Sequence, residues 1–467
     1  MNVPDAVRVA RAGLARLMEP SDLTGLALVA VAGPEEAFRL IGARDGKAPA
    51  REQQAVAELL EGFTATRAEH RLGAGLERWR PRLPDAAPER DLDTMRRLGG
   101  GLLVPEDPGW PDQFDALGLA APLCLWWRGT VEAPALPPVG DLVAVVGSRD
   151  ATAYGRQVTA ELASALVREA VTVVSGGAYG IDARAHEAAL AAGQCAGQCA
   201  GHSASAAAAR PVPPGGLPPT VAVMAGGLDR FYPAGNEDLL RRVAAAGVLL
   251  AEVSPGTAPT RWRFLQRNRL IAALCAATVV VEARWRSGAL TTAHRAAEMG
   301  REVGAVPGSV YSANSAGCHR LLREGAALAV TDAAEVLELL GRRQRPPFPR
   351  SDVGSGREGE AGPRAAGGPA TPETPAAPAG RGVPEDRAGQ GSGEAARSRE
   401  AARPHDGLDI QDLLLLDALP VRATSTPDKL GVVAGLGIGA VLGGLSRLQA
   451  RGLARRLGDG WQRARPD

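Results

Sequence analysis

Seven short apolar runs, rich in Val and nearly continuous, recur between residues 141 and 340, and segments with helical periodicity separate most of them. Strands of this composition are typical of a parallel sheet that is covered on both faces. The alternation of strand and helix predicts the same arrangement. We therefore expect an α/β domain over residues 141–341. The expected strands are 142–147, 171–175, 221–225, 248–253, 278–282, 303–307 and 328–331, and the expected helices are 155–169, 181–192, 236–246, 264–276, 289–300 and 318–324.

The segments before this region differ from it in composition. Residues 1–98 carry apolar residues at helical spacing, which predicts a small all-helical domain. Residues 99–140 form a Pro-rich lead-in segment with clustered aromatic side chains, among them Trp126 and Trp127. We expect this segment to connect the helical domain to the α/β domain.

The segments after the α/β region also separate by composition. Between Phe348 and His405 there is no Leu, Ile, Met or aromatic residue, so residues 342–407 cannot bury a core and are predicted to be a disordered linker. Apolar periodicity returns in residues 408–467, which we expect to form a small terminal domain similar to a winged helix. Its expected elements are helices at 408–419, 427–434 and 438–451 and a hairpin turn at 458–460.

Charge, cysteine content and hydropathy narrow the functional classes. Lys and Arg total 53 and Asp and Glu total 52, so the net charge of +1 by itself indicates no nucleic-acid partner. An odd number of cysteines without a signal peptide indicates a reducing cytoplasm. No run of 18 apolar residues occurs, so we expect no membrane-spanning helix. All basic residues except Lys47 and Lys429 are Arg, so an anion site here would depend on guanidinium groups.

Gly-rich turns follow several of the predicted strands. The first strand ends in Gly147-Ser148-Arg149, and the second is followed by Gly176 and Gly177. Such turns let backbone N–H groups approach an anion at a helix N-terminus, and Arg149 can supply a fixed positive charge. Asp182 lies early in the next helix, where a capping role and a role in the site are equally consistent with the sequence. Because similar turns recur at one sheet edge, the sequence predicts a surface that binds phosphates.

A local basic cluster strengthens that prediction. No Asp or Glu occurs between Val253 and Val281, and residues 261–269 contain four Arg interleaved with Trp and Phe. Guanidinium groups on phosphates and aromatic rings under bases are typical of single-strand binding. We expect the arginines of this segment to bind nucleic acid and Phe264 to be buried. Arg284 and Arg286 would extend the patch.

The sequence shows no catalytic set, no cofactor motif and no complete metal site. The dinucleotide pattern G-x-G-x-x-G, the Walker Lys and H-E-x-x-H are all absent. His186 and His294 lie within predicted helices, where packing or solvation is the usual role. Residues 194–219 contain a tandem AGQC repeat. Cys195, Cys199 and His202 could contribute to a metal site, but a fourth ligand is missing, and a surface loop is the favoured interpretation.

Several motifs together resemble the DprA/Smf family of DNA-processing proteins: GSR, SGGAYGID, AGGLDRFYPAGN, RFLQRNRLIAAL, VVVEARWRSGALTTA and AVPG. The resemblance covers nearly all of residues 141–340. It implies an extended Rossmann-like core that binds single-stranded DNA, forms a homodimer and loads RecA recombinase in natural transformation. It also implies an N-terminal domain similar to SAM or helix-hairpin-helix modules, and no catalysis. Carried over by motif, the DNA-binding residues would be Gly147, Ser148, Arg149, Ser175, Gly176, Gly177, Ala178, Gly180, Tyr232, Asn236, Arg267, Asn268 and Arg269.

The sequence departs from the family pattern at two places. Ala234-Gly235 follow Tyr232-Pro233 where relatives often have a basic residue, which would shift the phosphate contact to Arg230 or Arg242. His319 occupies a position that is Asn in the family.

Two other functional classes remain open at this point. One is an enzyme of the related Rossmann-like superfamily that binds or cleaves nucleotide derivatives, similar to cytokinin-activating phosphoribohydrolases. Those enzymes carry P-G-G-x-G-T-x-x-E, whereas Pro307-Gly308 is followed here by Ser309-Val310, so the catalytic Glu is missing. The other is a transcriptional regulator that uses the terminal domain. That function would require a more basic third helix than one carrying only Arg447 and Arg451.

Overall fold

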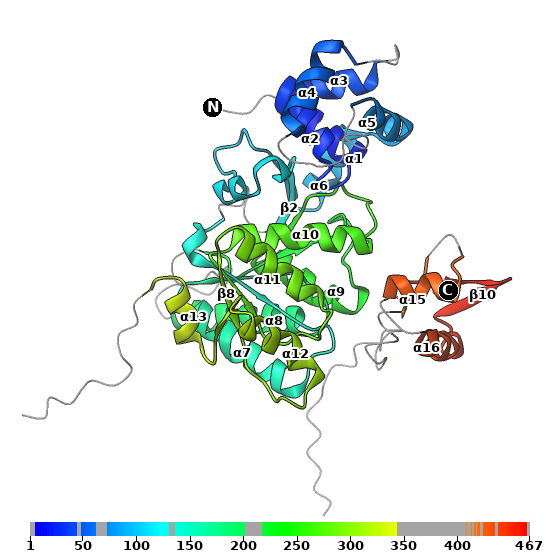
Figure 1. Cartoon of the computed structure of the whole chain (residues 1–467). Coiled ribbons are helices and arrows are strands. Elements are labelled where there is room, and N and C mark those ends of the chain that lie inside the picture. The colour runs from blue at the N-terminus through cyan, green and yellow to red at the C-terminus, as the bar shows by residue number, and fades with distance from the viewer. Residues whose placement is uncertain are drawn as a thin grey trace, which may run out of the picture. The chain divides into compact units, whose positions relative to one another are not determined.

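A computed structural model describes residues 5–43, 48–61, 72–129, 136–200, 217–342 and, with short gaps, 408–464. Its largest sheet has nine strands in the order β1-β2-β6-β5-β4-β3-β7-β8-β9. Figure 1 shows the ribbon, with β2 and β8 of this sheet labelled. The strands are β1 (Gly100–Leu103), β2 (Leu125–Gly129), β3 (Leu142–Val146), β4 (Thr172–Ser175), β5 (Thr220–Met224), β6 (Val248–Ala251), β7 (Ala277–Val280), β8 (Glu302–Ala305) and β9 (Leu328–Ala329).

The seven strands from β3 to β9 are parallel, as the sequence predicts. From β3, the chain builds outwards through β4, β5 and β6 on one side, then returns to β3 and continues through β7, β8 and β9 on the other. Ligands of such doubly wound sheets bind where this order reverses, outside the carboxyl ends of the strands. Here that point lies between β3 and β7, which pair from Val143 and Ala277 to Val146 and Val280.

The lead-in segment adds two strands that are not among the predicted ones. β2 pairs antiparallel with β6, and β1 pairs antiparallel with β2, so the sheet is mixed. Trp126 and Leu125 of β2 are fully buried. The aromatic residues of this segment therefore extend the sheet and its core.

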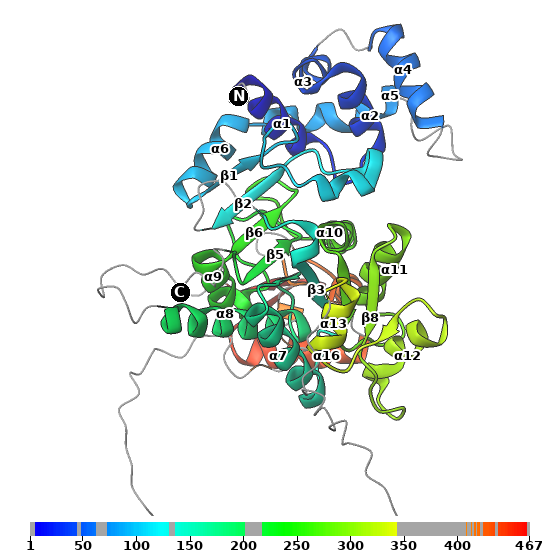
Figure 2. The ribbon, with the colours of Figure 1, turned by 90° about the vertical axis from the view of Figure 1, so that its left-hand side faces the viewer.

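Alternating side chains of each parallel strand bury against opposite layers of helices. Val143 and Val145 of β3 pack in the cluster that holds α7 and α8, whereas Ala144 and Val146 pack in the cluster that holds α10 and α11. Figure 2 shows these two layers on either side of the strands. The helices are α7 (Ala153–Arg168), α8 (Ile181–Ala200), α9 (Glu237–Ala246), α10 (Arg261–Leu274), α11 (Gly288–Glu298), α12 (Ala316–Arg323) and α13 (Ala333–Leu339).

The N-terminal part is helical, in agreement with its periodicity. Leu14, Leu28, Ile41 and Trp79 meet in a hydrophobic core separate from the clusters on the sheet. Assignment of this part to a SAM or helix-hairpin-helix module remains a prediction. Its helices are α1 (Asp5–Leu17), α2 (Leu23–Ala32), α3 (Pro34–Gly42), α4 (Ala50–Glu61), α5 (Leu72–Trp79) and α6 (Pro88–Arg97).

One predicted boundary is wrong. Helix α8 ends at Ala200 and not at 192, so the expected surface loop does not begin at 194. Small residues dominate this stretch, and none of them interrupts a helix as Pro does. Cys195 is exposed on α8, whereas the side chain of Cys199 and the whole of His202 lie outside the described residues.

The C-terminal residues form helices and a hairpin around a hydrophobic cluster of their own. Helices α15 (Pro427–Ala434) and α16 (Ile438–Ala450) precede β10 (Ala454–Leu457) and β11 (Gly460–Arg463), which pair antiparallel around the predicted turn. Half of the predicted helix 408–419 and nearly all of the predicted linker 342–407 lie outside the described residues. The winged-helix assignment therefore stays a prediction.

Candidate functional site

A groove opens at the point where the strand order reverses. One wall is the turn after β3, with Gly147, Ser148 and Arg149, and another is the first half of α10. A third wall is the turn between β7 and α11, with Ser287 and Gly288. Among the predicted DNA-binding residues, the groove is lined by Gly147, Ser148, Arg149, Ala178, Tyr232, Arg267 and Asn268. The fold thus gathers residues from four separate stretches of sequence.

The groove contains one aromatic ring beside two guanidinium groups. Phe264 is half-buried, and the Cζ atoms of Arg149 and Arg267 lie 4.9 Å and 5.6 Å from its ring centroid. The ring of Tyr232 lies 5.8 Å from that of Phe264. Arg149 makes no ion pair with any residue that the structure describes. The expected burial of Phe264 is wrong, because its ring is only half-buried and lines the groove.

Arg267 is held in place by the sheet below it. Its Nη1 donates to the Val223 carbonyl oxygen, and its side chain packs against Gly176, where any Cβ would collide with the guanidinium. Burial lowers the pKa of Arg267 to about 10, an effect that the nearby Asp182 opposes and Arg149 reinforces. Arg267 remains charged at neutral pH, so two cations face the same space. This geometry suits an anion that can accept hydrogen bonds from both.

The turn after β4 supports the groove from behind. Gly177 and Gly180 have φ angles of 66° and 77°, which favour glycine. The Asn236 side chain donates to the Gly177 and Ala178 carbonyl oxygens at 3.0 Å each. The buried Asp182 accepts from the Gly176 backbone N–H at 3.2 Å. Burial raises the pKa of Asp182, and Arg267 acts in the opposite direction. Asp182 therefore braces this turn in addition to lining the groove.

The turn after β7 is tied to the turn after β3. The Glu282 carboxylate accepts from the Thr152 backbone N–H at 2.9 Å and from its hydroxyl at 2.6 Å. Arg284 pairs with Asp150 at 2.6 Å. The Ser287 hydroxyl caps α11, and Asn268 donates to the Gly288 carbonyl oxygen at 3.3 Å. Glu282 thereby holds the turn after β7 against the turn after β3.

Several predicted DNA-binding residues do not reach the groove. The Ser175 hydroxyl is fully buried and donates to the Val145 carbonyl oxygen at 2.7 Å. Asn236 supports the turn described above. Arg269 is 5% exposed, and its Nη2 lies 2.6 Å and 2.7 Å from the two carboxylate oxygens of Glu252. The expectation that Ser175 and Arg269 contact DNA does not fit these positions, because both polar groups already have internal partners.

Helical periodicity explains the division of the basic cluster. On α10, Arg261, Phe264 and Asn268 line the groove, and Arg267 reaches it from the same side. Arg263 and Arg269 point instead towards the N-terminal helices, where they donate hydrogen bonds to Glu19 and Ser21, respectively. Consecutive residues of a helix point 100° apart, so four closely spaced arginines cannot share one face. Arg230, proposed to replace a missing basic residue, is highly exposed and lies beside Asp229.

Thr260 and Leu265 are examples of groove residues that the sequence analysis did not single out. Thr260 lines the groove and caps α10, accepting a hydrogen bond from the Arg263 backbone N–H at 3.2 Å. A Thr directly before a helical segment is a recognised capping signal. Leu265 lines the groove beside Phe264 and is 39% exposed. Its exposure depends on the rotation of α10, which the composition of the segment does not reveal.

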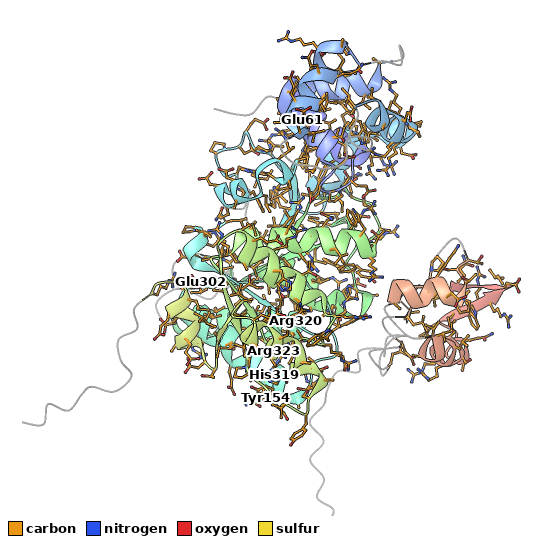
Figure 3. The ribbon with its side chains drawn as sticks, viewed as in Figure 1. Glu61, Tyr154, Glu302, His319, Arg320 and Arg323 are labelled. Carbon is orange, nitrogen blue, oxygen red and sulfur yellow. The ribbon has the colours of Figure 1, made fainter. Side chains whose placement is uncertain are left out.

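The loop after β8 is held at two points near this edge. The Tyr154 hydroxyl donates to the Pro307 carbonyl oxygen at 2.7 Å, and His319 Nε2 lies 3.0 Å from the Gly308 carbonyl oxygen. Figure 3 labels both side chains in the same region of the core. His319 thus has a structural contact at the position where the family pattern has Asn.

The described ranges contain no group of three His, Cys, Asp or Glu residues arranged to hold a metal ion. In the same ranges, no helix is long and apolar enough to cross a membrane.

Comparisons with known proteins place the chain among relatives. The family model for DNA recombination-mediator protein A matches residues 101–211 and 215–341. A putative DNA processing protein DprA of Mycobacterium tuberculosis strain H37Rv is 38% identical over 382 residues, which are 80% of this chain and 79% of that protein. DprA of Streptococcus pneumoniae strain R6 is 39% identical over 217 residues, 46% of this chain and 66% of that protein. An X-ray structure of S. pneumoniae DprA has a TM-score of 0.52 and 27% identity, covering 72% of this chain and 98% of that one.

Proposed function

Since the chain belongs to the family of DNA recombination-mediator protein A, we propose that it is a DNA processing protein that binds single-stranded DNA in the groove between β3 and β7. The observation that carries this proposal is the convergence of Arg149 and Arg267 on the half-exposed ring of Phe264. Guanidinium groups neutralise phosphates, and an accessible ring provides a surface on which a base can stack.

A single strand suits this site better than a duplex. Bases of a duplex are stacked on each other and cannot lie on a protein ring, whereas an unpaired base can. Gly147 and Gly288 also line the groove, and without side chains they let a phosphate come close to the backbone. The N-terminus of α11 lies beside Gly288, and a helix N-terminus stabilises an anion. These features read the backbone and the face of a base, so we expect little sequence preference.

The proposal extends to the biological role. The relatives are named as DNA processing proteins. The motif resemblance supports a role in natural transformation, with delivery of the strand to RecA recombinase. The same resemblance supports a homodimer formed through the α/β core. We propose binding without catalysis, because Asp182 already accepts a backbone hydrogen bond and Glu282 already joins two turns.

Fluorescence anisotropy of the full chain with labelled oligonucleotides tests the proposal. Single-stranded oligonucleotides should bind more tightly than duplexes of equal length, and the logarithm of affinity should fall linearly with the logarithm of salt concentration. Equal or tighter binding of the duplex would overturn the proposal. Release of a nucleobase or cleavage of a nucleotide derivative by the pure protein would favour the enzymatic alternative.

A further inference from the structure

Helix α10 contacts two parts of the molecule at once. Phe264 and Asn268 face the groove, while Arg263 and Arg269 face the loop between α1 and α2. That loop, residues 18–22, belongs to the N-terminal helical part and contributes no residue to the groove. The helix is therefore one physical connection between the N-terminal helices and the proposed DNA site.

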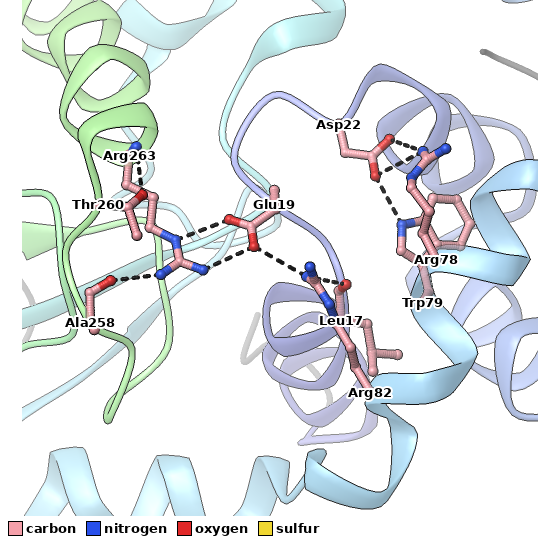
Figure 4. A network of polar contacts seen from close by, with 9 residues as sticks. All are labelled: Leu17, Glu19, Asp22, Arg78, Trp79, Arg82, Ala258, Thr260 and Arg263. Carbon is pink, nitrogen blue, oxygen red and sulfur yellow. Dashed lines mark hydrogen bonds and ion pairs between the residues drawn. The ribbon is translucent and has the colours of Figure 1, made fainter. Parts of the chain in front are cut away.

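The main contact is a bidentate ion pair. Arg263 Nε and Nη2 donate to the two carboxylate oxygens of Glu19 at 3.0 Å and 2.9 Å (Figure 4). The remaining Arg263 nitrogen, Nη1, donates to the Ala258 carbonyl oxygen at 2.6 Å. Glu19 also pairs with Arg82 at 3.2 Å. One guanidinium thus joins the α1–α2 loop to the segment that leads into α10.

Two further contacts hold the same region. Arg269 Nε donates to the Ser21 hydroxyl at 2.7 Å, and Ser21 has a φ angle of 62°, in the left-handed region that residues other than glycine rarely adopt. Arg16 of α1 donates to the Pro255 carbonyl oxygen at 2.7 Å while pairing with Asp91. Strained backbone persists where surrounding contacts require it.

These contacts surround a wall of the groove. Residues 252–260 connect the end of β6 to α10, and Pro259 and Thr260 of this segment line the groove. Arg16 of the N-terminal part donates a hydrogen bond to the Pro255 carbonyl of this segment. Arg263, which Glu19 holds, donates one to the Ala258 carbonyl. Without these contacts, residues 255–260 would have to be ordered when DNA binds, and ordering costs affinity.

We propose that Glu19 is a positioning residue for the DNA groove: by orienting Arg263 it fixes the first turn of α10 and residues 255–260, so the N-terminal helices set the affinity for a single strand without touching it. This inference rests on the proposed function. Glu19 adds no positive charge to the groove, so its effect differs in kind from that of a phosphate-binding arginine.

The test compares Glu19→Gln with Asp22→Asn in the full chain. Asp22 lies in the same loop but contacts Arg78 and Trp79, which belong to the N-terminal part (Figure 4). Glu19→Gln should weaken single-strand binding about 3- to 10-fold with an unchanged salt slope, because no phosphate contact is lost. Asp22→Asn should lower the melting temperature and leave the affinity unchanged.

A double-mutant cycle with Arg263→Gln identifies the path of the effect. If Glu19 acts through Arg263, the double variant should bind no more weakly than Arg263→Gln alone. Wild-type affinity in Glu19→Gln, or equal losses in Glu19→Gln and Asp22→Asn, would overturn the inference. A flatter salt slope in Glu19→Gln would also overturn it, since DNA would then contact this surface directly.

Hydrogen exchange of the free protein separates this inference from the proposed function. Glu19→Gln should increase amide exchange in residues 255–265 relative to wild type and to Asp22→Asn, whether or not DNA binds. Unchanged exchange there would overturn the positioning role. Increased exchange in a protein that binds no single strand would instead contradict the proposed function alone.

Discussion

The guanidinium of Arg149 lies over the ring of Phe264, with its Cζ atom 4.9 Å from the ring centroid. Arg149 follows the first parallel strand and Phe264 belongs to the helix after the fourth, so only the folded sheet brings them together. Arg267 lies 5.6 Å from the same centroid. A ring face attracts cations, and it orients two guanidinium groups here that would otherwise repel each other. The site is therefore prepared for an anion before one binds.

Replacement of Arg149 should reveal a phosphate contact. Arg149→Ala should weaken binding to all single-stranded oligonucleotides alike and flatten the slope of log affinity against log salt by about 0.7, the value for one phosphate on a single strand. Anisotropy titrations across salt measure both quantities. Arg295→Ala is the matched control, because Arg295 is exposed on α11 and pairs with Glu298 outside the groove. Binding by Arg149→Ala at wild-type affinity at every salt concentration would refute the assignment.

Replacement of Phe264 should separate stacking from charge. Phe264→Leu retains apolar bulk but removes the ring face, so single-strand affinity should fall by about 1–3 kcal/mol, the range of one base–aromatic stack. The salt slope should change little, because Arg149 and Arg267 remain. Tyr311→Leu, at a residue that is 97% exposed and outside the groove, should bind like wild type. A slope as flat as that of Arg149→Ala would show that the ring acts only by holding the arginines.

Replacement of Arg269 should destabilise the fold without changing the salt slope. Arg269→Ala leaves the Glu252 carboxylate buried without its partner, and breaking such a pair typically costs about 3–5 kcal/mol. Urea unfolding measures the loss. The double variant Arg269→Met/Glu252→Leu should recover much of it, since no isolated charge remains. A flatter salt slope in that double variant would instead restore Arg269 to the DNA site.

His186 should make stability depend on pH in mildly acidic solution. Burial lowers the pKa of His186 to about 3, and the positive charge of Arg267 acts in the same direction. Its Nδ1 lies 2.7 Å from the Thr220 hydroxyl, and Nε2 has no hydrogen-bond partner among the described residues. The folded state keeps the ring neutral, whereas the unfolded chain takes up a proton below its ordinary pKa. The stabilisation is therefore complete above that pKa and declines as pH falls towards 3.

Chemical unfolding at pH 6.5 and pH 4.5 measures this effect. The loss from His186 over that interval should be about 2–3 kcal/mol, from 1.36 kcal/mol for each pH unit. His186→Gln should be less stable than wild type at pH 6.5, and the difference should narrow at pH 4.5. Parallel pH profiles for the two proteins would contradict a neutral, buried imidazole.

The parallel sheet and its helices could be predicted because their signals are local. Val-rich runs such as the one in β3 are buried on both faces, so every residue of the strand has to be apolar. The Gly147 and Gly176 turns could be placed at one sheet edge for the same reason, since parallel strands end together. The strands β1 and β2 are harder to predict from the sequence. Gly100–Leu103 and Leu125–Gly129 are short and lie among Pro, Gly and aromatic residues that also suit a loop.

The sequence alone determined that cations, glycines and aromatic rings would meet at the carboxyl ends of the strands. Only the tertiary structure decided which of them face the groove. Phe264, Arg267 and Arg269 lie within two turns of one helix, yet the first two line the groove and the third is buried against Glu252 and Ser21. The rotation of α10 is set by its packing on the sheet and on the N-terminal helices. Because those partners are distant in sequence, the local pattern of residues does not predict that rotation.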